Sequence, residues 1–163
     1  MTIILILLFV LLILVLYSIF YKDHSIKKVV NLIKASLEKK YKTIAINKIS
    51  KNTYEINAEN NKYLFFIYFI PLNTTVQINS STTWELKIAN SSSAGASHTK
   101  TRYLNNISNF MNIKTEAKKI IIFTPSPKKV VMYINECEII NVDAKTNVYG
   151  TNIIRIDDIS KLK

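Results

Sequence analysis

The sequence Lys62–Pro71, KYLFFIYFIP, decides the fold because it is the longest apolar run outside the N-terminus. It is rich in aromatic and β-branched residues. Asn60-Asn61 before it and Pro71 after it are residues that favour turns. The run therefore predicts a buried strand at the centre of the domain. No charged side chain occurs between Lys62 and Glu85.

Shorter stretches on both sides of this run predict the remaining elements. Alternating or continuous apolar patterns predict strands at 43–50, 53–58, 73–78, 83–88, 118–123, 130–134, 138–142 and 152–156. Helical spacing of apolar residues predicts helices at 25–41 and 98–112, and Asp157 or Asp158 could cap a short C-terminal helix. The Ser-rich residues 90–97 predict a loop. The order of elements predicts an α/β domain in which one mixed sheet has a helix on each face.

The N-terminus is a separate apolar segment. Residues 3–20 are apolar except for Ser18, and as a helix they would cross a bilayer core. Lysines are frequent after this segment and absent before it, which predicts an external N-terminus and a cytoplasmic domain. We therefore expect a single-pass membrane protein with an anchor at 1–21 and a domain at 22–163. A cleaved secretion signal is the alternative.

The composition favours an anionic partner and gives few candidates for chemistry. Lys and Arg total 22 against 11 Asp and Glu, a net charge of +11. Such a balance suits nucleic acid, acidic lipid or an acidic protein, although the Lys, Asn and Ile bias could also arise by compositional drift. Cys137 is the only cysteine, and His24 and His98 lie far apart, so we expect no disulfide and no zinc site. The two glycines are too few for a phosphate-binding loop.

One short pattern has the spacing of a metal-dependent nuclease. Glu85-Leu86-Lys87 on a strand places the carboxylate and the ammonium on the same face. With a second acidic residue, such a carboxylate could hold Mg²⁺ while the lysine helps to activate water. The alternative is a solvent-facing ion pair, which a three-residue match does not exclude.

From about Ser25 onward, the chain resembles the nuclease-related domain (NERD) family of the PD-(D/E)XK nuclease superfamily. Trp84 comes where the family has a Trp after a hairpin, and the 100–112 segment stands where the family has a Gln-bearing helix. Ile120-Ile121-Ile122-Phe123 looks like the family's buried strand. The resemblance implies a restriction-endonuclease-like domain, and members often carry an N-terminal membrane span.

The family's catalytic motif is degenerate in this chain. Glu55 occupies the place of the family's Asp, but Tyr68 stands where Glu is expected and Ile70 where Lys is expected. The family's Asn-Pro-x-x-Gln signature is also absent. If the alignment is shifted by one hairpin, Glu85 and Lys87 become the pair, with Glu55 or Glu59 as the second acid.

These features together predict a membrane-anchored binding or accessory module that has lost catalysis. Nucleic acid is a candidate ligand, with Lys100 and Arg102 contacting phosphates. We expect no metal and no cofactor. The alternatives are an active Mg²⁺-dependent nuclease that uses Glu85 and Lys87, and a secreted protein.

Overall fold

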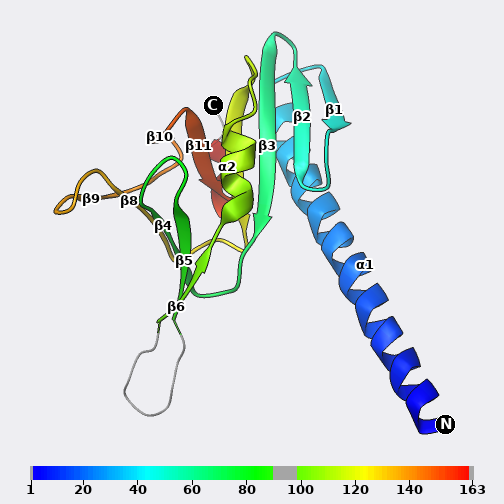
Figure 1. The fold of residues 1–163 in the computed structure, drawn as a ribbon. Coiled ribbons are helices and arrows are strands. Elements are labelled where there is room, and N and C mark those ends of the chain that lie inside the picture. Colours follow the sequence, from blue (N-terminus) through cyan, green and yellow to red (C-terminus); the bar gives the residue numbers. More distant parts are fainter. Residues whose placement is uncertain (1, 90–98, 162–163) are drawn as a thin grey trace.

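The fold has three layers, with a long helix on one face of a large sheet and a second sheet with a short helix on the other face (Figure 1). The computed structural model describes residues 2–89 and 99–161. The loop predicted at 90–97 and His98 lie outside these residues. The helices are α1 (Thr2–Glu38), α2 (Asn105–Met111) and the 3₁₀ helix η1 (Ile156–Lys161).

The strands form two sheets, so the prediction of one mixed sheet was wrong. Sheet A has the spatial order β1 (Ile44–Lys48), β2 (Thr53–Ala58), β3 (Asn61–Phe69), β7 (Lys118–Thr124), β11 (Thr151–Arg155) and β10 (Asn147–Val148). Sheet B has the order β6 (Thr99–Tyr103), β5 (Trp84–Ala89), β4 (Thr74–Ile78), β8 (Lys129–Tyr133) and β9 (Ile139–Asn141). The chain leaves sheet A after β3, and β4 pairs with β5 and β8 instead of returning to β3. The protein is therefore a mixed α/β fold, as expected, with its strands divided between two layers.

Strand β3 lies in the interior of sheet A, which confirms the prediction made from its apolar run. It pairs antiparallel with β2 and parallel with β7. Tyr63, Phe65 and Ile67 belong to the core beneath α1, whereas Leu64 and Phe66 belong to the core between the two sheets. Because both faces of β3 are buried, its sequence is apolar at consecutive positions.

A hydrogen-bonded pair of tyrosines lies in the core beneath α1. The hydroxyl oxygens of Tyr41 and Tyr63 are 2.9 Å apart and buried. Burial, together with this hydrogen bond, raises the pKa of Tyr63 to about 12. The Tyr63 hydroxyl therefore stays protonated near neutral pH.

The second half of α1 is part of this core. Ile26, Val29, Ile33 and Leu37 recur at a spacing of three or four residues and pack on sheet A, as expected from the helical spacing of apolar residues at 25–41. The first half of α1 extends away from the sheets (Figure 1), and large apolar side chains such as Phe9 are exposed there.

The transmembrane prediction was wrong. In the part of the chain that the structure describes, no helix combines the length and the apolarity that a bilayer crossing requires. Residues 3–20 instead belong to the first half of α1. The helix continues without a break to Glu38, and its second half packs on sheet A. The prediction of a single-pass membrane protein with a cytoplasmic domain, which depended on that helix, is wrong as well.

The helix predicted at 98–112 is two elements. Thr99–Tyr103 is the edge strand β6, paired antiparallel with β5, and Asn105–Met111 is α2. Lys100 and Arg102 therefore lie on a strand and not on a helix. Ile107 and Phe110 of α2 pack on the face of sheet A opposite α1.

Candidate functional site

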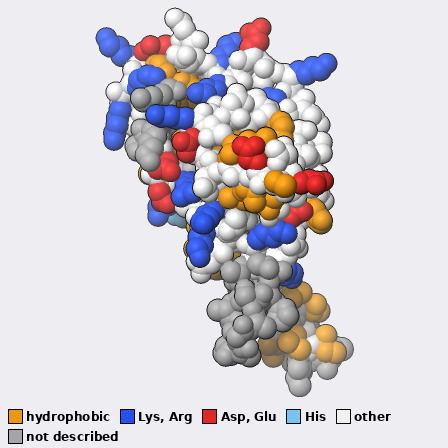
Figure 2. Space-filling model, turned by 90° about the vertical axis from the view of Figure 1, so that its left-hand side faces the viewer, with side chains coloured by type: hydrophobic (Ala, Val, Ile, Leu, Met, Phe, Trp, Pro, Cys, Tyr) orange, Lys and Arg blue, Asp and Glu red, His pale blue; other side chains and the backbone are white. Residues whose placement is uncertain are grey.

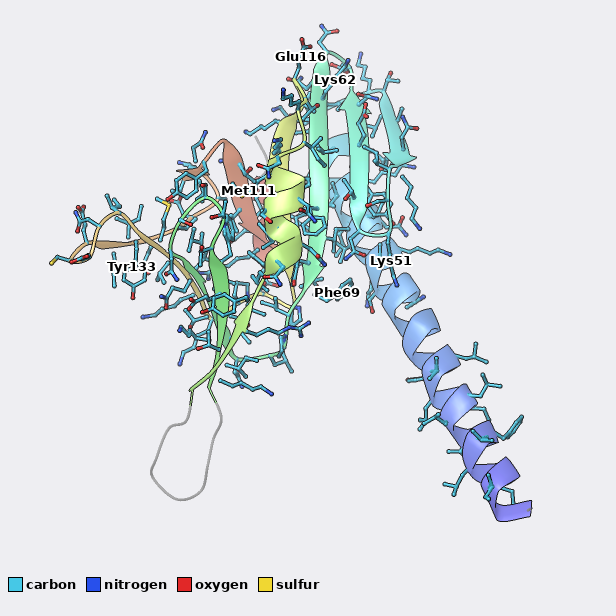
Figure 3. The ribbon with its side chains drawn as sticks, in the orientation of Figure 1. Lys51, Lys62, Phe69, Met111, Glu116 and Tyr133 are labelled. Carbon is cyan, nitrogen blue, oxygen red and sulfur yellow. The ribbon has the colours of Figure 1, made fainter. Side chains whose placement is uncertain are left out.

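The turn between β1 and β2 lies at one end of β3 and forms one wall of the candidate site. The backbone N–H of Ile49 donates to the carbonyl oxygen of Thr53 at 3.0 Å, which closes the turn. The N–H of Ile67 in β3 donates to the carbonyl oxygen of Asn52 at 2.9 Å. These bonds hold Lys51 beside the end of β3, where Figure 3 places it near Phe69.

A hollow of about 260 Å³ lies beside this turn and is here called the cationic hollow. The residues that line it come from the turn, α1, β3, β6 and α2: Ile26, Lys51, Asn52, Tyr68, Phe69, Arg102 and Asn106. Two of these described lining residues are cations and none is an acid. Neither Lys51 nor Arg102 forms an ion pair with a carboxylate in the described residues. Both charges are therefore available to an anion.

Arg102 reaches the hollow because of its position on β6. It pairs with Leu86 of β5, whose side chain lies in the core between the sheets, so Arg102 is on the inner side of its strand. Burial raises the pKa of Tyr68, and the nearby Arg102 charge opposes this rise. The Tyr68 phenol is therefore a neutral hydroxyl near neutral pH that can donate a hydrogen bond in the hollow.

A second hollow of about 370 Å³ adjoins the first and is here called the amide hollow. It is lined by Ser50, Lys51, Asn52, Thr53, Phe66, Asn106, Asn109, Phe110 and Ile113. The two hollows share Lys51, Asn52 and Asn106, so they lie side by side between the β1–β2 turn and α2, and together they are here called the groove. The Phe66 and Phe110 rings, which border the amide hollow, are stacked with their centroids 5.1 Å apart.

Glu85 and Lys87 lie away from this groove. The Lys87 ammonium is 2.8 Å from one carboxylate oxygen of Glu85, and the Asn79 amide donates to the other oxygen at 3.0 Å. Lys87 also donates to the Thr101 hydroxyl at 3.0 Å. Glu85 is buried, and both of its oxygens are occupied by neighbouring side chains.

The acids proposed to join Glu85 lie on the other sheet. Glu55 is on β2, where its carboxylate accepts a hydrogen bond from the Asn57 amide at 3.2 Å. Glu59 is in the turn after β2 and accepts from the backbone N–H of Lys42 at 2.8 Å. Within residues 2–89 and 99–161, no group of three His, Cys, Asp or Glu side chains is placed to hold a metal ion.

Replacing Glu85 with alanine tests whether this ion pair has a structural role. Glu85→Ala is expected to lower the free energy of unfolding by about 1–3 kcal/mol because Lys87 and Asn79 lose their partner. Urea unfolding measures the change, and the exposed Glu136→Ala, within about 0.5 kcal/mol of the parent, is the control. An unchanged stability would contradict a structural role. Mg²⁺-dependent DNA cleavage that disappears in Glu85→Ala would instead support the nuclease alternative.

The residues at the degenerate motif positions have different environments. Tyr68 lines the cationic hollow, whereas Ile70 is buried in the core between the sheets. Of the two predicted phosphate-binding residues, Arg102 lines the hollow and Lys100 is exposed farther along β6. The sequence analysis missed Lys51, Asn52, Asn106 and Asn109, because single polar residues in a turn and a short helix form no recognisable pattern.

The basic side chains are otherwise dispersed. Figure 2 views the molecule from the side of sheet B and shows Lys and Arg side chains scattered around a patch of hydrophobic ones. The β8–β9 hairpin on this side carries the exposed Ile134 and Ile139. The net charge alone therefore does not locate the site, which is instead marked by Lys51 and Arg102 lining the same hollow.

No family model, curated protein or solved structure matches this chain. The resemblance to the nuclease-related domain family stays a prediction.

Proposed function

We propose that this protein is a non-catalytic binding module for nucleic acid, which it holds by the phosphates in the cationic hollow. The observation that carries the proposal is that Lys51 and Arg102, from the β1–β2 turn and from β6, line the same hollow with no acidic neighbour among its described lining residues. The electrostatic field of two unpaired cations in a concave site attracts anions.

The chemistry of the lining residues suits a phosphate group. The Arg102 guanidinium can donate two parallel hydrogen bonds to phosphate oxygens, and Lys51 supplies a compact second charge. The Tyr68 hydroxyl and the Asn52 and Asn106 amides add neutral donors. Contacts of this kind position a nucleic-acid backbone without reading its sequence.

The same residues support binding without chemistry. The described lining of the cationic hollow contains no carboxylate, imidazole or thiol. It offers no carboxylate to hold Mg²⁺ and no carboxylate or imidazole to act as a general base. Tyr68, at the position where the resemblance expects a catalytic Glu, is a hydrogen-bond donor in this arrangement.

The test compares two double variants that each remove two positive charges, one pair at the cationic hollow and the other on strands β3 and β7 of sheet A. Lys51→Ala/Arg102→Ala is expected to weaken binding of fluorescein-labelled oligothymidine about tenfold or more. The slope of log K against log salt should fall by about 0.7 for each phosphate that the variant no longer neutralises. Lys62→Ala/Lys118→Ala is the control, because both lysines are exposed and Lys62 lies at the far end of the sheet (Figure 3).

Fluorescence anisotropy over a range of salt concentrations measures both quantities. Lys62→Ala/Lys118→Ala should change the affinity and its salt dependence much less than Lys51→Ala/Arg102→Ala does. Equal losses in the two double variants would contradict the proposal, because they would show that binding follows net charge alone. Absence of binding by the parent protein would contradict it directly.

A further inference from the structure

The cationic hollow and the amide hollow form one groove with two chemically different halves. Only the first half has Arg102 and the Tyr68 hydroxyl, and only the second has Asn109, Ile113 and the stacked Phe66 and Phe110 rings. Asn52, Asn106 and Lys51 border both halves. A ligand that fills the groove therefore needs an anionic part joined to a neutral part.

The amide hollow has the chemistry of a site for a flat polar heterocycle. Each of Asn52, Asn106 and Asn109 offers two donors and one acceptor. In the described part of the chain, no other side chain or backbone group hydrogen-bonds to these amides. The exposed Ile113 contributes most of the apolar surface, beside the buried Phe66 and Phe110 rings. A nucleobase has this combination of a polar edge and apolar faces.

A base can enter this hollow only when it is unpaired. A phosphate in the cationic hollow and its base in the adjoining hollow require that the base leaves its stack, and paired bases in a duplex resist this. In a single strand, the edges and faces of the bases are already accessible.

We propose that the amide hollow binds an unpaired nucleobase, so that the ligand of this groove is a single strand. This inference rests on the proposed function and adds the form of nucleic acid that is bound. Substitution of Asn109 distinguishes base binding from phosphate binding, because Asn109 lines the amide hollow and not the cationic hollow.

The test uses oligothymidine, an abasic strand of the same length and a duplex as fluorescent probes. The parent protein is expected to bind oligothymidine about tenfold more tightly than the abasic strand and more tightly than the duplex. Asn109→Leu, which keeps the branched shape of the side chain but removes the amide, should lose this preference while its affinity for the abasic strand is unchanged. Asn105→Leu is the control, because Asn105 is exposed on the same helix and lines neither hollow.

The possible results separate this inference from the proposed function. Equal affinity for oligothymidine and the abasic strand, or tighter binding of the duplex, would overturn the base site and leave phosphate binding intact. Equal losses for all three probes in Asn109→Leu would also overturn it. If no probe binds the parent protein, both the base site and the proposed function fail.

Discussion

Phe66→Ala is expected to lower the free energy of unfolding by about 3–5 kcal/mol. Phe66 is buried on β3, stacks on Phe110 of α2 and contacts Tyr68 edge-on, with centroids 5.8 Å apart in the second pair. Truncation removes both ring contacts and leaves a cavity between sheet A and α2, which the surrounding strands can close only in part. Urea unfolding followed by circular dichroism measures the loss of stability.

Leu72→Ala is the matched control for this substitution. Leu72 follows β3 in the sequence but is 71% exposed, so its truncation should change the stability by no more than about 0.5 kcal/mol. A Phe66→Ala variant as stable as Leu72→Ala would contradict the packing of α2 on this face. Because Phe66 borders the amide hollow, the same variant should also lose the preference for oligothymidine over the abasic strand.

Ile33→Ala is expected to lower the free energy of unfolding by about 2–4 kcal/mol. Ile33 is 0% exposed and lies between α1 and sheet A. Its neighbour Leu32 is 47% exposed, so Leu32→Ala removes a side chain of similar size from the same helix at little cost.

The difference between these two neighbours tests whether the second half of α1 belongs to the domain core. If Ile33→Ala and Leu32→Ala had equal effects, α1 would not pack on sheet A in solution. Thermal unfolding gives a second measurement, in which only Ile33→Ala should lower Tm by several degrees.

The buried strands were predictable because their composition reflects their position. Continuous apolar runs such as Leu64–Phe69 and Ile120–Phe123 occur where both faces of a strand are covered. The strands of the hairpins that β4 forms with β5 and that β8 forms with β9 were also predicted, since polar turn residues separate them. These features depend on residues close together in the chain.

The arrangement of the strands was not predictable in the same way. The parallel pairing of β4 with β8 joins segments far apart in the sequence, and no local pattern indicates that it forms a second sheet. The 98–112 segment was misassigned because Leu104, Ile107 and Phe110 have helical spacing. This helical spacing made the preceding residues look like part of the helix, although they form strand β6. Alternate residues of β6, such as Arg102, face the inner side of sheet B.

The site could be predicted only in part for the same reason. Arg102 was predicted together with Lys100 as a basic residue of the segment taken for a helix, and it does line the groove. Lys51 is one of many lysines, and only the fold brings it beside Arg102. Glu85 and Lys87 were correctly placed on one strand face, but the structure surrounds them with Asn79 and Thr101 as hydrogen-bond partners.

The tyrosine pair beneath α1 bears on how the chain avoids misalignment during folding. A strand that is apolar on both faces keeps most of its hydrophobic burial if it shifts by one residue, so apolar patterning alone specifies its register poorly. Such a shift in β3 would replace Tyr63 by Lys62 or Leu64 at the position opposite the buried Tyr41 hydroxyl. Lys62 at this position would bury an ammonium, and Leu64 would leave the Tyr41 hydroxyl without a partner. Both outcomes cost free energy. The hydrogen bond between Tyr41 and Tyr63 thus favours the observed alignment of the central strand over one shifted by a residue.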